Sequence, residues 1–164
     1  LEEVTFRRTV IPVQELLDAA GKYFKKSMKN RSERIELEIE PMEAKVIGDV
    51  NQLRFLLENL IDEALTVRED GVIRLQARKD NEYIRFLFTD TRREKSVEEL
   101  NQLFYPNLAR MTSGEKGELR GTEYLVCKQI IRDHDEFAGR RGCRINAEPA
   151  EGGGFTVYFT IPRR

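Results

Sequence analysis

Five segments of the chain show the alternation of hydrophobic and polar residues, or the run of β-branched and aromatic residues, that is typical of β-strands. They cover residues 34–40, 72–78, 83–89, 143–148 and 155–162. The alternation is strict in the first segment, where Ile35, Leu37 and Ile39 share one face and three glutamates share the other. The second and third segments are separated by Lys79-Asp80-Asn81, which is typical of a hairpin turn.

Hydrophobic residues at helical spacing predict three longer helices, which begin near Pro12, Asp49 and Gly121. Pro12 suits a first helical turn, and Asp49 with Gln52 three residues later is typical of a helix start. A further short helix is predicted to begin at Ser96. This order of strands and helices predicts an α/β fold, a two-layer sandwich in which helices cover one face of a mixed, roughly five-stranded sheet.

The length of 164 residues and the hydrophobic content of 40% allow one domain with its own core. We expect an entry strand or linker over residues 1–11 and a single domain over residues 12–164. Lys and Arg total 28 against 29 for Asp and Glu, and this balance argues against a nucleic-acid binder. No apolar run approaches the roughly 18 residues of a membrane span. The chain begins at Leu1 without an initiator Met, so we expect it to be a piece of a longer protein.

Four motifs follow one another along the chain, and each joins small or polar residues to a predicted strand or helix. They are Gly48-Asp49 before a leucine-rich helix that carries Asn59 and Glu63, Asp90 at a strand end, Gly121 before a helix, and Gly152-Gly153-Gly154 before the last strand. In this order they resemble the catalytic ATP-binding domain of sensor histidine kinases, of the Bergerat-fold superfamily that includes gyrase B. The resemblance covers roughly residues 10–162. It implies the histidine-kinase-like ATPase fold, ATP and Mg²⁺ as ligands, and protein histidine kinase activity, which is a transferase reaction.

The resemblance implies that an amide side chain on the nucleotide helix binds Mg²⁺. In the kinase register this position is Glu63, and in the gyrase register it is Asn59, with Phe55 in place of the carboxylate that activates water. A carboxylate can bind Mg²⁺, but it adds negative charge beside the phosphates. The alternative is that Asn59 and Glu63 are solvated helix residues one turn apart.

Asp90 matches the aspartate that, in the family, accepts a hydrogen bond from the adenine amino group. The alternative is a strand-end aspartate that caps the following turn. The two family glycines beyond it are Arg92 and Glu94 here. Because glycines let the backbone approach the base and the phosphates, we expect these long charged side chains to crowd the pocket or fill it.

The phosphate-binding loop of the family is represented by Gly117 and Gly121, with Glu123 where a second glycine of the pair would stand. Glycine-rich turns before helices bind phosphate through free N–H groups, and a carboxylate there would repel a triphosphate. The alternative is that both glycines only punctuate a loop. We expect His134, at a helix end, to be structural and not a phosphoacceptor.

Because three working elements are altered together, we interpret the chain as a histidine-kinase-type ATP-binding domain of a two-component signalling protein. We expect weak or absent ATP and Mg²⁺ binding, no activity of the fragment alone, and a role as an interaction module. The alternatives are an active kinase domain that phosphorylates a histidine on an upstream helix, and a gyrase-like or anti-sigma-type ATPase, which residues 61–65 favour.

The resemblance implies as partners the upstream dimerisation helices or sensor region of the parent protein, with a response regulator as a further candidate. We expect neither nucleic acid nor membrane contact for this fragment. We expect a cytoplasmic domain, and the resemblance leaves open a membrane anchor in the parent protein.

Overall fold

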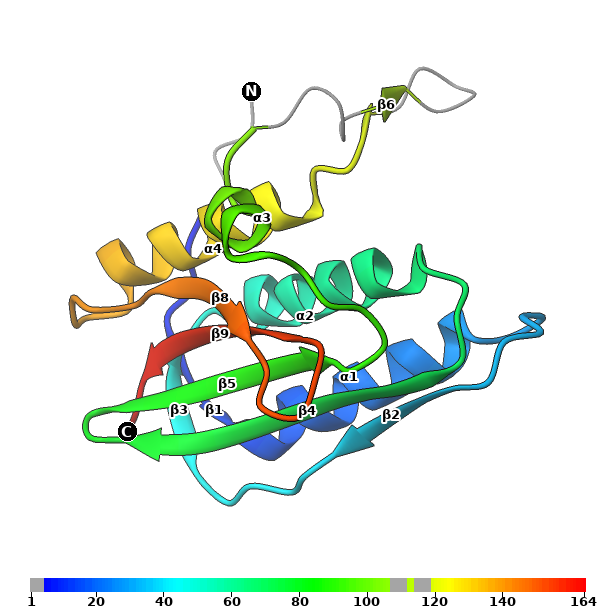
Figure 1. The fold of residues 1–164 in the computed structure, drawn as a ribbon. Coiled ribbons are helices and arrows are strands. Elements are labelled where there is room, and N and C mark those ends of the chain that lie inside the picture. Colours follow the sequence, from blue (N-terminus) through cyan, green and yellow to red (C-terminus); the bar gives the residue numbers. More distant parts are fainter. Residues whose placement is uncertain (1–4, 107–111, 114–118) are drawn as a thin grey trace.

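A mixed five-stranded sheet forms one layer of the protein (Figure 1). The computed structural model describes residues 5–106, 112–113 and 119–164. The strand order is β2-β4-β5-β9-β8, with bounds β2 Ile35–Ile39, β4 Gly71–Asp80, β5 Tyr83–Asp90, β9 Phe155–Pro162 and β8 Ile145–Pro149. Strand β2 is parallel to β4, and the other neighbours are antiparallel.

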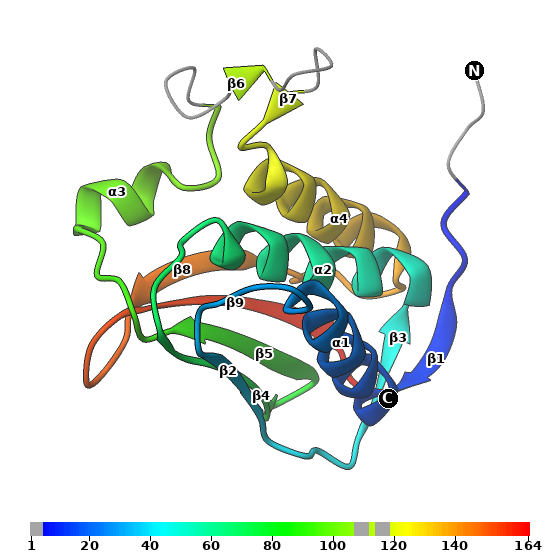
Figure 2. The same ribbon diagram turned by 90° about the vertical axis from the view of Figure 1, so that its right-hand side faces the viewer.

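Helices α1 (Val13–Ser27), α2 (Val50–Leu65) and α4 (Glu123–Phe137) cover one face of this sheet, as the two views show (Figures 1 and 2). The short helix α3 (Val97–Gln102) contacts β8. The predicted two-layer α/β sandwich, with helices on one face of a mixed five-stranded sheet, is therefore confirmed. Within the described part of the chain, no helix combines the length and the apolar character that a membrane span requires.

Strands β1 (Thr9–Pro12) and β3 (Lys45–Gly48) form a small antiparallel sheet beside α1. The sequence did not predict β3, which has only four residues and no sustained alternation. The expected division between residues 11 and 12 falls inside β1, and Ile11 is 2% exposed. Strands β6 (Thr112–Ser113) and β7 (Leu119–Arg120) form a further pair.

The core lies between the sheet and the three long helices. Phe86 of β5 and Phe159 of β9 stack there with ring centroids 4.9 Å apart, and both are buried. Leu37 and Ile39, expected in the core, are only half-buried, because β2 is at the edge of the sheet. Helix α4, predicted to begin near Gly121, extends as far as Phe137.

Candidate functional site

The residues predicted for the site come from three elements that meet on the helical side of the sheet. Asn59 and Glu63 lie on α2, Asp90 ends β5, and Gly121 precedes α4. Helices α2 and α4 pack directly against each other. Gly117, the remaining predicted residue, lies outside the described residues.

Asp90 forms a buried ion pair with Arg92. The Arg92 Nε–H donates to Oδ1 of Asp90 at 2.9 Å, and its Nη2 donates to Oδ2 at 2.8 Å. The backbone N–H of Arg92 donates to the same Oδ1 at 3.0 Å. The side chains are 1% exposed for Arg92 and 5% for Asp90. Such two-point pairing is the strong form of an arginine–carboxylate contact.

The rest of the Arg92 guanidinium is also fully bonded. Its Nη2 donates to the Ala64 carbonyl at 2.6 Å, and its Nη1 donates to the Val67 and Glu69 carbonyls, each at 3.0 Å. These carbonyls belong to the last turn of α2 and the loop after it, where helix geometry leaves acceptors without partners. A guanidinium has five N–H donors, and all five are used here.

Gly71 makes room for the stem of Arg92. Its φ is +143°, and a Cβ atom at this position would lie 2.5 Å from Cγ of Arg92. A side chain at position 71 would therefore displace Arg92. The glycine, at the start of β4, and the arginine, just after β5, form one packed unit.

Asp90 does not fit the role of an adenine acceptor in this arrangement. A base needs an exposed carboxylate oxygen, whereas both oxygens of Asp90 are buried against Arg92. Of the two behaviours expected for the long side chains after Asp90, crowding or filling, Arg92 fills the space. It does so with every guanidinium donor satisfied.

The candidate metal residues Asn59 and Glu63 lie one turn apart on α2. Asn59 is 7% exposed, and its Nδ2 donates to the Phe55 carbonyl at 2.8 Å, one turn earlier. Glu63 is half-buried one turn further on. No cluster of three or more histidine, cysteine, aspartate or glutamate side chains suited to a metal ion occurs among the described residues.

Cys127 of α4 is buried at the α2–α4 contact. Burial raises the pKa of the Cys127 thiol above its usual range, and the negative charges of Glu123 and Glu63 add to this effect. No described residue hydrogen-bonds Oε2 of Glu123, although that atom is buried.

Gly121 lies in the turn before α4 and has a φ of +80°. Thr122, the residue that caps the helix, makes no side-chain hydrogen bond to it, and Glu123 lies in the first turn. A carboxylate in the first turn interacts favourably with the positive end of the helix dipole, but it repels an anion bound there.

His134 is fully buried at the far end of α4, and the structural role expected for it is confirmed. Its Nε2 accepts from the Asp49 backbone N–H at 3.1 Å, so its Nδ1 carries the proton and donates to the Ile130 carbonyl at 2.8 Å. Burial lowers the pKa of this histidine. The Asp49 side chain accepts from the Gln52 N–H, as the helix-start motif predicted.

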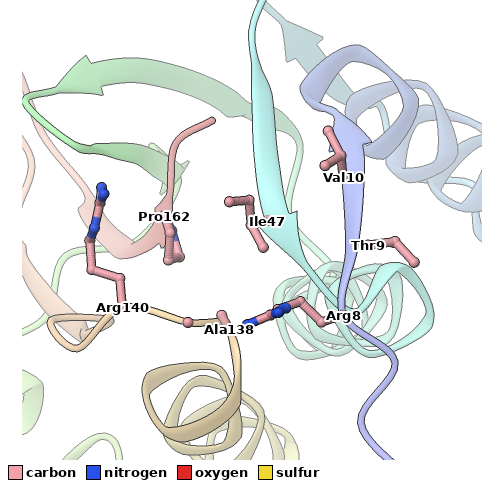
Figure 3. A pocket seen from close by; sticks show the side chains of 8 residues that line it. Arg8, Thr9, Val10, Ile47, Ala138, Arg140 and Pro162 are labelled. Atoms are coloured by element: carbon pink, nitrogen blue, oxygen red, sulfur yellow. The ribbon is translucent and has the colours of Figure 1, made fainter.

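A separate cavity of about 370 Å³ lies between the β1–β3 sheet and the C-terminal end of α4 (Figure 3). Arg8, Val10, Ile47, Arg140 and Pro162 are among the residues that line it. Arg140 is held at the Glu82 carbonyl, 3.1 Å from its Nη1. None of the predicted site residues in the described ranges lines this cavity.

Comparison with known proteins gives a family and a fold. Residues 48–164 match the model of the histidine kinase-, DNA gyrase B- and HSP90-like ATPases. No curated protein matches the chain.

Among solved structures, a mycobacterial sensor histidine kinase, MprB, is 19% identical over 96% of this chain and 99% of its own, with a TM-score of 0.72. The nucleotide-free catalytic domain of the histidine kinase ThkA is 21% identical over 98% of both chains, also with a TM-score of 0.72. In a complex of ThkA with the response regulator TrrA, this chain covers 44% of the matched chain, at 19% identity and a TM-score of 0.72. The likeness shows that the fold is that of histidine kinase catalytic domains, and the family match, which covers more than half of the sequence, shows that the chain belongs to the histidine kinase-, DNA gyrase B- and HSP90-like ATPase family.

Proposed function

We propose that this chain is the histidine-kinase-type domain of a two-component signalling protein, that it binds Mg-ATP weakly or not at all, and that it acts as an interaction module. The observation that carries the proposal is the Arg92 guanidinium, buried and fully bonded against Asp90 and the end of α2.

The free energies of the two contacts that Asp90 could make favour the ion pair with Arg92 over a hydrogen bond from adenine. To admit adenine, Arg92 must give up its acceptors, and breaking a buried ion pair costs about 3–5 kcal/mol. One hydrogen bond from the base to the Asp90 carboxylate would return only about 1.5–3 kcal/mol. Replacing Arg92 by a base at Asp90 therefore costs more free energy than the new hydrogen bond returns.

The phosphate side of the site adds to this disadvantage. Glu63 on α2 and Glu123 on α4 both raise the pKa of Cys127, so both carry negative charge toward the α2–α4 contact. A polyanion bound at this contact would be repelled by both carboxylates. A bound Mg²⁺ would have to offset both.

The signalling context is taken from the structural relatives. They are sensor histidine kinases, and one of them was solved together with a response regulator. By this analogy the partners of the chain are the dimerisation helices or sensor region of its parent protein, and a response regulator is a further candidate. His134 is too deeply buried to receive a phosphoryl group.

A thermal-shift titration with Mg-ATP tests the proposal. A domain with a dissociation constant of about 10 μM would gain about 2.7 kcal/mol at about 1 mM ligand. At about 2–4 °C per kcal/mol, its melting temperature would rise by about 5–11 °C. We expect a rise below about 2 °C for this chain.

A catalytic domain of an active sensor kinase, measured in the same buffer, is the positive control. The full shift in this chain would contradict the proposal and favour the active-kinase alternative. In a parallel assay with labelled ATP we expect no acid-labile phosphate on the chain. Phosphate label on His134 would also contradict the proposal.

A further inference from the structure

Strand β8 leaves one side of its backbone without a neighbouring strand. It ends the strand order and pairs only with β9 (Figure 1). The Thr160 N–H donates to the Arg144 carbonyl, and the Ala150 N–H donates to the Gly154 carbonyl. These two bonds identify the residues that form hydrogen-bonded pairs at the two ends of β8.

In an antiparallel pair, hydrogen-bonded and non-hydrogen-bonded residues alternate. Asn146 and Glu148 therefore bond to β9, while the N–H and C=O groups of Ile145 and Ala147 point away from it. Pro149, the last residue of β8, has no N–H and ends this outward edge. The edge thus offers a short ladder to one more extended chain.

A groove runs along this edge. A cavity of about 680 Å³ lies between α4 and β8, and another of about 420 Å³ lies between α3, α4 and β8. Both are lined by Lys128, Ile145 and Asn146, so they lie next to each other along β8. Tyr105, 54% exposed, forms part of the wall, with Nζ of Lys128 4.2 Å from the centre of its ring.

The groove is basic. Lys128, Arg132, Arg141 and Arg144 line it, against two acids, Asp135 and Glu136. Asp135 is neutralised, since its Oδ1 accepts from the Gly142 and Cys143 N–H groups and its Oδ2 lies 3.3 Å from Nε of Arg141. Arg132 and Arg144 are exposed and make no ion pair with any residue in the described ranges.

We propose that the groove along β8 docks an extended acidic segment of a partner polypeptide, which adds a strand at Ile145 and Ala147 while its carboxylates meet Arg132 and Arg144. The proposal names the partner chemistry of the interaction module and rests on the function proposed above. Main-chain bonds at the edge supply affinity, and the cations supply selection for acidic side chains.

A peptide fits this surface better than other polyanions. The outward N–H and C=O groups alternate at the spacing of a β-strand, and a phosphate backbone has no donor for the carbonyls. The other edge of the sheet, β2, is acidic, but its Glu38 and the neighbouring Glu40 are held by Arg74 and Arg78, so a second copy is a poorer occupant.

The test is an NMR titration of the ¹⁵N-labelled chain with a capped peptide of alternating glutamate and valine. The amide signals of Ile145 and Ala147 should shift, and their exchange with water should slow. The amides of Asn146 and Glu148, already bonded to β9, should keep their exchange rates. This alternation is the signature of strand addition.

Variants separate the two parts of the proposal. Arg132→Glu should weaken peptide binding about tenfold, which is about 1.4 kcal/mol. Lys25→Glu, the same charge reversal on the solvent face of α1, should change it less than about twofold at physiological salt, because charges beyond about 8 Å are screened. Ala147→Pro should abolish binding and leave the β9 amides in place, since the N–H it removes does not bond to β9.

The proposal is overturned if Ile145 and Ala147 do not respond, if a lysine–valine peptide binds equally well, or if only an oligonucleotide or anionic vesicles produce the shifts. Shifts that appear on raising the protein concentration alone would point to a second copy and also overturn it. Mg-ATP is added in the same series. Shifts at Asp90 and Arg92 would contradict the proposed function and leave the β8 result to be judged by itself.

Discussion

The two ends of α2 are both fastened by side chains from distant parts of the sequence, but with different chemistry. At the N-terminal end, Asp49 caps the helix and His134 accepts its backbone N–H. At the C-terminal end, Arg92 binds the Ala64 carbonyl and two carbonyls of the following loop, and Asp90 balances its charge. One end relies on a neutral imidazole, and the other on a buried ion pair.

The C-terminal end shows how a side chain of the protein itself can occupy the place that the resemblance gives to a base. Helix ends need partners for their free backbone groups. At the C-terminal end of α2, Arg92 bonds the Ala64 carbonyl and Arg31 bonds the Leu65 carbonyl. Arg92 also pairs with the Asp90 carboxylate that the resemblance gives to a base.

The largest effect is expected for Arg92→Ala. It removes the guanidinium that pairs with the buried Asp90 carboxylate and donates to three carbonyls, so unfolding free energy should fall by about 3–5 kcal/mol. Melting should drop by about 6–20 °C, at about 2–4 °C per kcal/mol. Arg93→Ala, on an exposed neighbour, should change stability by less than about 0.5 kcal/mol. Equal, small effects of both would mean that Arg92 does not hold this end.

A smaller loss is expected for His134→Leu, which keeps the bulk of the side chain but removes its nitrogens. The Asp49 N–H then loses its acceptor, at a cost of about 1–3 kcal/mol in chemical denaturation. If this variant were as damaging as Arg92→Ala, the two ends would not differ in the way described.

Asp49→Ala removes the helix cap itself, and it should cost about 0.5–2 kcal/mol. Asp49→Ser, which can still accept from the Gln52 N–H, should recover most of that loss. Denaturation midpoints of the two variants measure this directly. No recovery by serine would show that the carboxylate, and not the cap, is what α2 requires.

His134 should also make stability depend on pH. Burial lowers its folded-state pKa below the ordinary value of 6.5, although the Ile130 carbonyl and the charges of Asp49 and Asp133 oppose this. The unfolded chain then binds the proton more tightly, so the stabilisation is complete above about pH 6.5 and is lost as the pH falls below it. The slope is at most about 1.4 kcal/mol per pH unit.

His134→Leu should flatten this slope between about pH 7 and 5.5, because the chain has no other histidine. Glu33, Glu40 and Glu99 have lowered pKa values, so their contributions change only at lower pH, below about 5. An unchanged slope in the variant would show that another group titrates.

The sequence predicted the N-terminal end of α2 well, because its signal is local. Asp49 and Gln52 are three residues apart, and the same spacing predicted the capping box of Ser96 and Glu99 before α3. Local spacing of this kind follows directly from helix geometry.

The C-terminal end could not be predicted to the same depth. The substitution of Arg92 for a family glycine indicated a crowded pocket, but its acceptors are backbone carbonyls, which leave no mark in a sequence. They lie 23 to 28 residues before it in the chain, and only the fold brings them together. Glu63 and Glu123 were singled out from sequence, but their shared neighbour Cys127 was not.

The state of the Arg92 guanidinium tests the central claim most directly. In a ¹H–¹⁵N spectrum of the arginine side chains, assigned by the loss of one signal in Arg92→Lys, the account predicts a resolved Nε–H of Arg92 that exchanges slowly with water and does not move when Mg-ATP is added. An Nε–H that exchanges as fast as that of exposed Arg93, or that shifts with Mg-ATP, would contradict it.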